Sequence, residues 1–287
     1  MLLIAHVGAG RKYETSSRID VLKDALKEGF KVLQKKDALA SVITTVKIFE
    51  ECGLFNAGTG SVLTISGTVE MDACIMTSEG KCGAVSCVTG IKYPIELARL
   101  VMEKTDHVIL CSAGAMEFAR SCGLKYFPSV QPERVKKFHE LLSKNDLKYY
   151  KKVKDFLDDP YGTVGACAID RNGLIVAGTS TGGIWGKLPG RVSDSAIPGA
   201  GTYCNSYGGI SCTGHGEGVL KHCIAYFAGE LLEKMDAQKV ATHCVEKFCD
   251  VSFGLIIVDK NGNPGYAYNT EMMLGGYINE KDLLVFE

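Results

Sequence analysis

The stretch GTVGACAIDRNGLIVAGTSTGG, residues 162–183, decides the fold of this chain. It holds two runs of apolar and β-branched residues, 163–169 and 174–177, separated by the four residues Asp170-Arg171-Asn172-Gly173. An Asn-Gly pair between two such runs is a strong signal for a tight turn. The middle of the sequence is therefore predicted to form a β-hairpin.

Predicted strands and helices alternate on both sides of this hairpin. Apolar residues recur at three- and four-residue intervals in the helical segments, and β-branched residues concentrate in the strand-like ones. Asp37 and Ser112 are expected to cap the helices that they begin. The expected elements are strands at 2–7, 61–67, 68–77 and 83–89, helices at 19–33, 37–49, 94–104 and 112–120, and, beyond the hairpin, helices at 219–233 and 236–249 and a second hairpin at 255–259 and 266–268. This order predicts a mixed α/β fold in which helices cover sheets.

A charged segment precedes the central hairpin. Between residues 131 and 159, seven lysines alternate with acidic residues, and the apolar stripe is thin. This composition is typical of a solvated helix with frayed ends. We expect a linker from about 131 to 162, which ends in Asp158-Asp159-Pro160-Tyr161-Gly162.

The composition of the 287 residues excludes several classes of function. Hydrophobic residues make up 46% of the chain, enough for a sizeable core. The 32 basic and 33 acidic residues leave a net charge of −1, which provides no field to attract nucleic acid or an anionic membrane. No apolar run approaches the roughly 20 residues of a membrane helix, and the N-terminus lacks the basic region of a secretory signal. The chain is therefore expected to be cytoplasmic, without nucleic-acid or membrane partners.

Familiar metal and nucleophile motifs are missing from the sequence. Twelve cysteines are present, but no two are spaced as in a zinc knuckle or a thioredoxin-type pair, so we expect reduced thiols that are mostly buried. There is no Gly-x-Ser-x-Gly elbow and no His-Glu-x-x-His motif, and the loop at 182–188 is one residue short of a phosphate-binding loop. No cofactor is predicted for the chemistry.

Short motifs rich in Gly, Thr and Ser occur in order after the charged segment, at 162–165, 179–183, 190–195 and 213–217. Taken singly, each is compatible with a turn or a helix cap. Together they contain the parts of a threonine-dependent hydrolase, because a Thr hydroxyl needs an adjacent base and the threonine's own α-amine can serve once it is an N-terminus. Thr163 would attack the carbonyl of Gly162, and Arg191 and Asp194 would hold a carboxylate and an ammonium group. The alternative is an ordinary strand that begins at Thr163 and a surface ion pair between Arg191 and Asp194.

These motifs resemble those of the N-terminal-nucleophile asparaginases, the plant-type isoaspartyl aminopeptidase/L-asparaginase family. The similarity spans nearly the whole chain. It covers HVGAG (6–10), LFNAGTGSVL (54–63), MDA (71–73), VMEKT (101–105), GTVGA (162–166), TSTGG (179–183), TGHGE (213–217) and GYAYNT (265–270). The motifs that begin at residues 162, 179 and 213 are the most specific.

The resemblance implies a four-layer αββα sandwich of the N-terminal-nucleophile hydrolase type. The precursor would cleave itself between Gly162 and Thr163 into an α-subunit (1–162) and a β-subunit (163–287), and two αβ units would form a homodimer. The implied reaction is hydrolysis of L-asparagine or of β-aspartyl (isoaspartyl) dipeptides through an ester on Thr163. The partner of the site is thus a small molecule or a dipeptide.

The resemblance also implies a catalytic role for five residues. Thr163 would be the nucleophile and its freed amine the base. Thr181 would orient the Thr163 hydroxyl, and Asn56 would support it from the α-subunit. The hydroxyl of Thr213 and the amide of Gly214 would form the oxyanion hole.

Substrate and cation binding are implied in the same way. Arg191 would hold the α-carboxylate of the substrate, while Asp194 and the carbonyl of Gly216 would hold its α-ammonium group. A structural sodium ion, a hard cation that prefers oxygen ligands, would be surrounded by backbone carbonyls. The family's cation loop matches Phe49, Glu50, Cys52, Phe55, Ala57 and Thr59.

Four positions depart from the family pattern. Val7 stands where the family has glycine, and a less flexible residue there is expected to slow or alter maturation if the loop must flip. Ser193 replaces a glycine and Ala196 a proline, both beside Arg191 and Asp194. Trp185 is bulky and is expected to narrow the substrate range.

Two other functions stay open. A glycosylasparaginase would use the same chemistry on Asn-linked sugar, although its substrates lie in secretory or lysosomal compartments. A precursor that never matures because of Val7 would be a non-enzymatic protein that only binds an amino acid. His6 is interpreted as a core histidine rather than a catalytic one.

Overall fold

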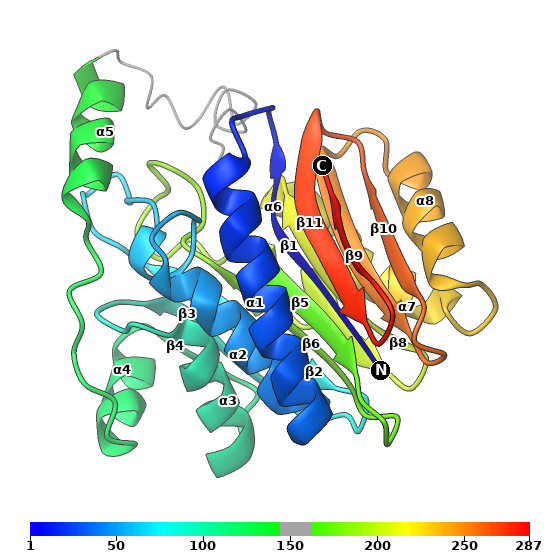
Figure 1. The fold of residues 1–287 in the computed structure, drawn as a ribbon. Helices are drawn as coiled ribbons and strands as arrows, with labels where there is room; N and C mark the ends of the chain where they lie inside the picture. Colours follow the sequence, from blue (N-terminus) through cyan, green and yellow to red (C-terminus); the bar gives the residue numbers. More distant parts are fainter. Residues whose placement is uncertain (144–161) are drawn as a thin grey trace.

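The computed structural model describes residues 1–143 and 162–287, which form two β-sheets and the helices around them (Figure 1). The larger sheet has the strand order β12-β11-β1-β5-β6-β2-β3-β4, and the smaller has the order β10-β9-β8-β7. The strands of the larger sheet are β1 (Leu2–Gly10), β2 (Met71–Thr77), β3 (Cys82–Val88), β4 (Ile109–Cys111), β5 (Val164–Ile169), β6 (Ile175–Thr181), β11 (Met272–Asn279) and β12 (Leu283–Phe286). Those of the smaller sheet are β7 (Thr202–Asn205), β8 (Gly208–Gly214), β9 (Phe253–Asp259) and β10 (Pro264–Tyr268).

Strands β1, β5 and β6 form the middle of the larger sheet, and all their residues are buried. β5 and β6 pair antiparallel, so the predicted central hairpin is confirmed. Asp170 fixes its turn, because one carboxylate oxygen accepts the N–H groups of Asn172 (2.8 Å) and Leu174 (3.1 Å). β1 pairs antiparallel with β5. The first strand of the chain therefore lies directly beside the segment that follows Gly162.

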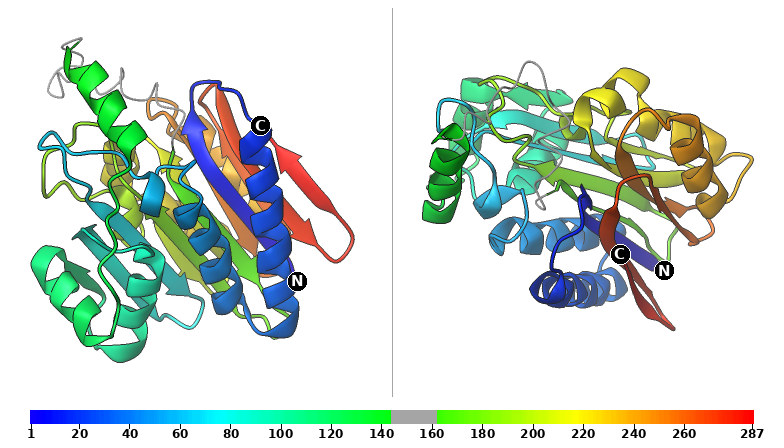
Figure 2. Two further views of the ribbon diagram at one scale, coloured as in Figure 1. Left: turned by 60° about the vertical axis from the view of Figure 1, so that its left-hand side comes forward. Right: turned by 90° about the horizontal axis from the view of Figure 1, so that it is seen from above.

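Helices cover the outer faces of both sheets, whose inner faces pack against each other (Figure 2). Those on the larger sheet are α1 (Ser16–Lys35), α2 (Ala38–Glu51) and α3 (Pro94–Lys104), and those on the smaller sheet are α7 (Ile224–Leu231) and α8 (Ala237–Lys247). The shorter elements are α4 (Ser112–Ser121), α5 (Pro132–Ser143) and α6 (Gly216–His222). Strands covered on both faces need apolar side chains on both, which explains the continuous apolar runs of β1 and β5.

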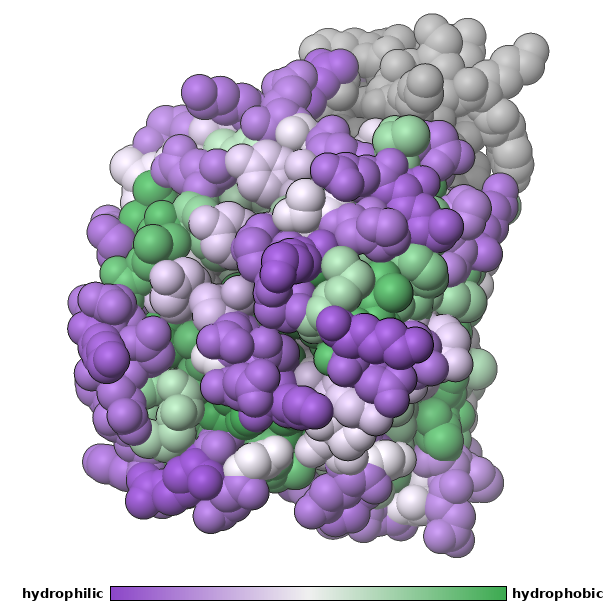
Figure 3. Space-filling view, turned by 90° about the vertical axis from the view of Figure 1, so that its right-hand side faces the viewer, coloured by the Kyte–Doolittle hydropathy of each residue, from purple (hydrophilic) through white to green (hydrophobic). Residues whose placement is uncertain are grey.

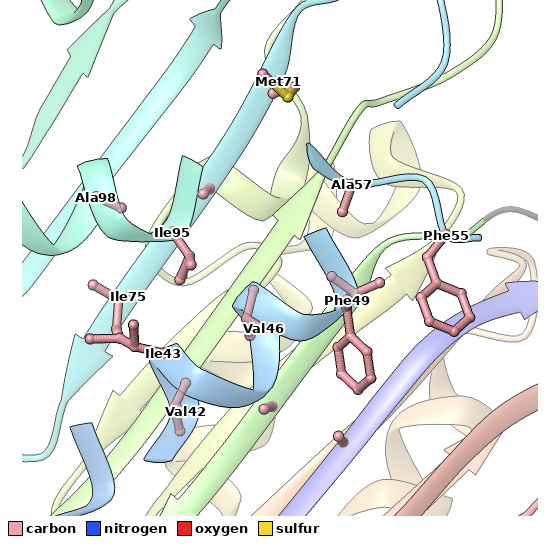
Figure 4. Packing of buried hydrophobic residues seen from close by; sticks show 14 of the residues in the cluster. Val42, Ile43, Val46, Phe49, Phe55, Ala57, Met71, Ile75, Ile95 and Ala98 are labelled. Atoms are coloured by element: carbon pink, nitrogen blue, oxygen red, sulfur yellow. The ribbon is translucent and has the colours of Figure 1, made fainter. Parts of the chain in front are cut away.

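Three clusters of buried apolar side chains fill the spaces between these layers. In the largest, the apolar face of α2 packs on the larger sheet beside α3 (Figure 4). Phe49, near the end of α2, meets Phe55 edge to face with ring centroids 5.5 Å apart. An aromatic pair of this geometry contributes about 0.5–1.5 kcal/mol beyond burial alone. This contact holds the loop that carries Asn56 against α2.

The predicted helix starts are confirmed at two of three positions. Asp37 caps α2 by accepting the N–H of Ala40 (2.7 Å), and α3 begins at Pro94. The prediction for α4 is wrong. Its N-cap residue is Cys111, and Ser112 adopts a left-handed φ of 48° as the first helical residue.

Two predicted segments differ from the structure. Residues 61–67 form no strand, because the Thr64 hydroxyl accepts the N–H groups of two later residues and Gly67 turns the chain with a φ of 75°. The helix predicted at 219–233 is two helices, α6 and α7, because Cys223 is left-handed with a φ of 47°. Of the predicted linker, residues 132–143 form α5, and residues 144–161 lie outside the described part of the chain.

The burial of the cysteines and the polarity of the surface are largely as the composition predicts. All twelve cysteines are free; six are buried, three are intermediate, and Cys111, Cys223 and Cys249 are exposed. The face in Figure 3 mixes hydrophilic residues with small separate apolar areas. Within residues 1–143 and 162–287, no helix has the length and apolar character that crossing a membrane requires.

Candidate active site

Thr163 lies immediately before β5, where its hydroxyl reaches the end of the neighbouring strand. Its Oγ1 donates to Oγ1 of Thr181, the last residue of β6, at 3.1 Å. Thr181 Oγ1 also accepts the N–H of Gly183 at 3.0 Å, so the Thr181 hydroxyl is held from both sides. The hairpin thus places the two threonines that the sequence predicted to act together within hydrogen-bond distance. Thr163 remains partly accessible, while Thr181 is buried.

Gly162 and Gly8 approach each other more closely than side chains would allow. A Cβ on Gly8 would lie 2.6 Å from the Gly162 Cα, and Gly8 has a φ of 123°, a conformation that only glycine adopts readily. Gly162, the residue before Thr163, therefore packs directly against β1. Val7, the departure at the preceding position, is fully buried in the largest apolar cluster.

Asn56 holds the turn after β6. Its backbone carbonyl accepts the N–H of Gly182 (2.9 Å), and its Nδ2 donates to the carbonyl of Gly183 (2.6 Å). Its Oδ1 accepts the N–H of Val62 (3.0 Å). Since Gly183 in turn donates to Thr181, Asn56 supports Thr163 through this turn.

Thr213 and Gly214 end β8, a strand that the sequence did not predict. The Thr213 hydroxyl accepts the N–H of Ala9 at 3.3 Å, and Gly214 has a φ of 125°. Ala9 follows Gly8, the residue that touches Gly162. The two predicted oxyanion-hole residues are therefore brought to the same end of β1 as the Gly162–Thr163 bond.

Arg191, Asp194 and Gly216 lie together. A Cβ on Gly216 would be 2.6 Å from Asp194 Oδ1 and 2.7 Å from Arg191 Nη2, so a side chain there would displace one of these groups. Both charged residues are largely buried, which argues against a surface ion pair. Arg191 instead makes a two-pronged ion pair with Glu217, Nε to Oε1 and Nη2 to Oε2, each at 2.9 Å.

Glu217 was missed by the sequence reasoning, although it ends the motif at 213–217. It is 26 positions from Arg191, so no local spacing links the two. Burial opposes ionisation of Glu217, but the Arg191 guanidinium overcomes this and lowers the pKa of the carboxyl below its usual value. Burial raises the pKa of Asp194 to about 7, against the opposing effect of Arg191.

A second missed carboxylate, Asp72, anchors the loop that carries Arg191. Its Oδ2 accepts the N–H of Ser193 (2.7 Å), and its Oδ1 accepts the Ser86 hydroxyl and the N–H of Cys87 (both 2.8 Å). Asp72 also pairs with Thr181 between β2 and β6. The motif at 71–73 therefore ties this loop to the strand of Thr181.

Two other departures from the family pattern are buried near this region. Ala196 ends the short 3-10 turn that Asp194 begins. Trp185 is a member of the largest apolar cluster, and the ammonium group of Lys137 lies 5.6 Å from its ring centroid. Its indole packs inside the protein with α5 nearby.

In the loop that matches the family's cation site, two glycines pack closely against backbone carbonyls. A Cβ on Gly58 would overlap the Glu50 carbonyl, and one on Gly60 would overlap the Phe55 carbonyl and lie 2.7 Å from that of Gly53. The Glu50 side chain points into the core, where its Oε1 accepts the Ser180 hydroxyl (2.7 Å), and burial raises its pKa to about 8. Among the described residues, no three His, Cys, Asp or Glu side chains form a metal-binding group.

Comparisons with known proteins agree with this geometry. The model of the family described as Asparaginase matches residues 1–286. The chain is 43% identical to the plant-type L-asparaginase of Pyrococcus horikoshii over 97% of its own length and 96% of that protein. It is 37% identical to the isoaspartyl peptidase/L-asparaginase of Danio rerio (95% and 90% covered) and 37% identical to the isoaspartyl peptidase of Salmonella typhimurium (95% and 93% covered). The chain therefore belongs to the asparaginase family.

Proposed function

We propose that this protein is an autoprocessed amidohydrolase that cleaves L-asparagine and β-aspartyl dipeptides through an ester on Thr163. The observation that carries the proposal is the Thr163–Thr181 hydrogen bond, made directly after Gly162, which packs against Gly8. The names of the relatives, L-asparaginase and isoaspartyl peptidase, support the choice of substrates. The layered sheets and helices fit a four-layer αββα sandwich of the N-terminal-nucleophile type.

Self-cleavage would use the Thr163 hydroxyl. Its oxygen attacks the carbonyl carbon of Gly162, the peptide C–N bond breaks, and the proton passes to the departing nitrogen. The product is an ester between Gly162 and Thr163 Oγ1. Water opens this ester, leaving a carboxylate on Gly162 and a free α-amine on Thr163. The chain would thus become subunits of residues 1–162 and 163–287.

Turnover would use the freed amine of Thr163 as the base. It takes the hydroxyl proton while Oγ1 attacks the side-chain amide carbon of the substrate, and the Thr213 hydroxyl and Gly214 N–H stabilise the negative charge that develops on oxygen. The leaving group is ammonia from asparagine, or the amino group of the second residue of a β-aspartyl dipeptide. Water then hydrolyses the ester on Thr163.

Arg191 would bind the substrate α-carboxylate with the N–H groups that Glu217 does not use. A guanidinium has five N–H donors, and Glu217 accepts from Nε and Nη2. Glu217 would thereby hold the guanidinium plane fixed while the substrate approaches it. Asp194 and the Gly216 carbonyl would accept hydrogen bonds from the α-ammonium group.

A structural sodium ion is also proposed in the loop after α2. Phe49, Glu50, Cys52, Phe55, Ala57 and Thr59 would hold it through backbone oxygens. Such an ion would offset the partial negative charge of these oxygens and so stabilise the loop of Asn56. We also propose that two αβ units form a homodimer and that the protein is cytoplasmic.

The experiment that tests the proposal combines intact mass with three substrates. We expect the purified protein to give two masses, for residues 1–162 and 163–287, and to release aspartate from L-asparagine and from a β-aspartyl dipeptide. Turnover of an N-glycosylated asparagine alone would favour the glycosylasparaginase alternative. A full-length chain that binds aspartate without turnover would overturn the proposal in favour of a non-enzymatic binding protein.

Substrate affinity is expected to improve as the pH rises through about 7. Asp194 can hold an ammonium group only as a carboxylate, and its raised pKa of about 7 leaves it protonated at lower pH. The KM for L-asparagine should therefore fall between pH ~5.5 and ~8 and then level off. In Asp194→Asn the KM should be high and independent of pH in this range. A flat profile in the unmodified enzyme would contradict the assigned role of Asp194.

A further inference from the structure

A row of polar side chains lies buried between the two sheets, in a region otherwise packed with apolar residues. His6, Thr179, Thr202 and Ser211 are all fully buried. In the larger sheet His6 pairs with Gly165 and Gly165 with Thr179, so the row crosses β1, β5 and β6. In the smaller sheet Thr202 pairs with Ser211 across β7 and β8.

Hydrogen bonds connect the whole row. His6 Nε2 lies 2.8 Å from Ser211 Oγ, and Ser211 Oγ lies 2.8 Å from Thr179 Oγ1. The Thr202 hydroxyl lies 2.7 Å from Thr179 Oγ1 and 3.0 Å from the carbonyl of Ser195. It has one proton, so it can donate to the carbonyl of Ser195 while it accepts from the Thr179 hydroxyl. Buried polar groups are costly unless paired, so a continuous chain of this kind holds its members in fixed positions.

Gly165 makes room for this row. A Cβ at Gly165 would overlap Ser211 Oγ and lie 2.6 Å from His6 Nε2. The glycine therefore has a defined purpose in the motif at 162–165, two residues after Thr163. Its replacement by alanine would force His6 and Ser211 apart.

The two ends of the row reach the two halves of the candidate site. At one end, His6 pairs with Gly165 between β1 and β5, two residues after Thr163, and burial lowers the pKa of the ring to about 3, so that the ring is neutral. At the other end, Ser195 belongs to the same 3-10 turn as Asp194. The row thus begins beside the nucleophile and ends beside a predicted substrate ligand.

We infer that His6, Ser211, Thr179 and Thr202 are positioning residues that set Thr163 and Asp194 relative to each other through this row. The inference rests on the proposed function, since it assigns a purpose to groups around that site. The His6 end supports β5 at Gly165, two residues after Thr163, during self-cleavage. The Ser195 end supports the turn of Asp194 during substrate binding.

Variants at the two ends should have different effects. Ser211→Ala breaks the links to His6 and to Thr179 and is expected to slow self-cleavage about 10-fold, because small displacements of a nucleophile cost large factors in rate. Thr202→Val keeps the shape of threonine but removes the links to Ser195 and to Thr179. It is expected to raise KM about 5- to 10-fold and to slow self-cleavage less than Ser211→Ala does. Thr202→Ser, which keeps the hydroxyl, should restore the normal KM.

The measurements are the rate of appearance of the 163–287 fragment, the KM and kcat of the mature enzyme, and the midpoint of thermal unfolding. If the row has only a structural role, every variant should have a lower midpoint of thermal unfolding, and KM and the cleavage rate should change together in all of them. That result would overturn the inference. Cleavage rates and KM values that are equal in the unmodified chain, Ser211→Ala and Thr202→Val would overturn this inference but leave the proposed function intact. An unmodified chain that stays uncut would instead overturn the proposed function.

Discussion

A chain carrying Thr163→Ala is expected to run as one uncut polypeptide of 30.9 kDa and to release no measurable aspartate. The substitution removes the hydroxyl of the residue that follows Gly162, which is hydrogen-bonded to Thr181. Without it neither the ester nor the free α-amine can form, so nucleophile and base are lost together. Loss of a nucleophile that acts as a unit with its base lowers kcat by about 10⁴-fold or more. A denaturing gel and an ammonia-release assay check both results.

Thr163→Ser is the matched control for this variant. Serine keeps the hydroxyl and the α-amine but lacks the methyl group that restricts the side chain rotamer, so we expect slower but complete cleavage into two fragments. N-terminal sequencing should then find a new chain that begins with serine at position 163. Two fragments of normal size from Thr163→Ala would show that the chain is cut by another route.

The second large effect is expected for Arg191→Ala, whose kcat/KM should fall by at least about 100-fold, or about 2.7 kcal/mol. The variant removes the group proposed to bind the α-carboxylate. It also leaves the Glu217 carboxylate without its partner and facing a substrate of the same charge. Most of the loss should appear in KM. Self-cleavage should proceed, because Arg191 is not part of the Gly162–Thr163 contact, and the two fragments on a gel confirm that the variant folds.

The double variant Arg191→Ala/Glu217→Gln separates the two causes. Glutamine has nearly the shape of glutamate without its charge, so the double variant should bind L-asparagine better than Arg191→Ala alone, by about 5- to 10-fold. The single variant Glu217→Gln should weaken binding only modestly, since it can still accept a hydrogen bond from the guanidinium. A double variant no better than Arg191→Ala would show that Glu217 does not face the substrate.

Features that depend on neighbouring residues were predictable from the sequence. The hairpin at 163–177 follows from Asp170, which bonds to backbone groups within four positions, and the start of α2 follows from Asp37 and Ala40. Ser112 failed as a cap although it has the right side chain, because its backbone is left-handed. The ordered threonine motifs also indicated the family, which the comparisons confirm.

Only the tertiary structure decided which remote segments of the chain contact each other. β7 has only four residues and β8 is rich in glycine, so their periodicity is weak. They become strands because β8 pairs with β9 and packs against the larger sheet. The pairing of Arg191 with Glu217 and of His6 with Ser211 joins residues 26 and 205 positions apart. A turn or a helix cap is stabilised by groups a few bonds away. The remote pairs form only when the packing of both sheets offsets the loss of chain entropy that closing long loops requires. The sequence by itself therefore predicts which residue types form the site, and the tertiary structure determines the distances between them.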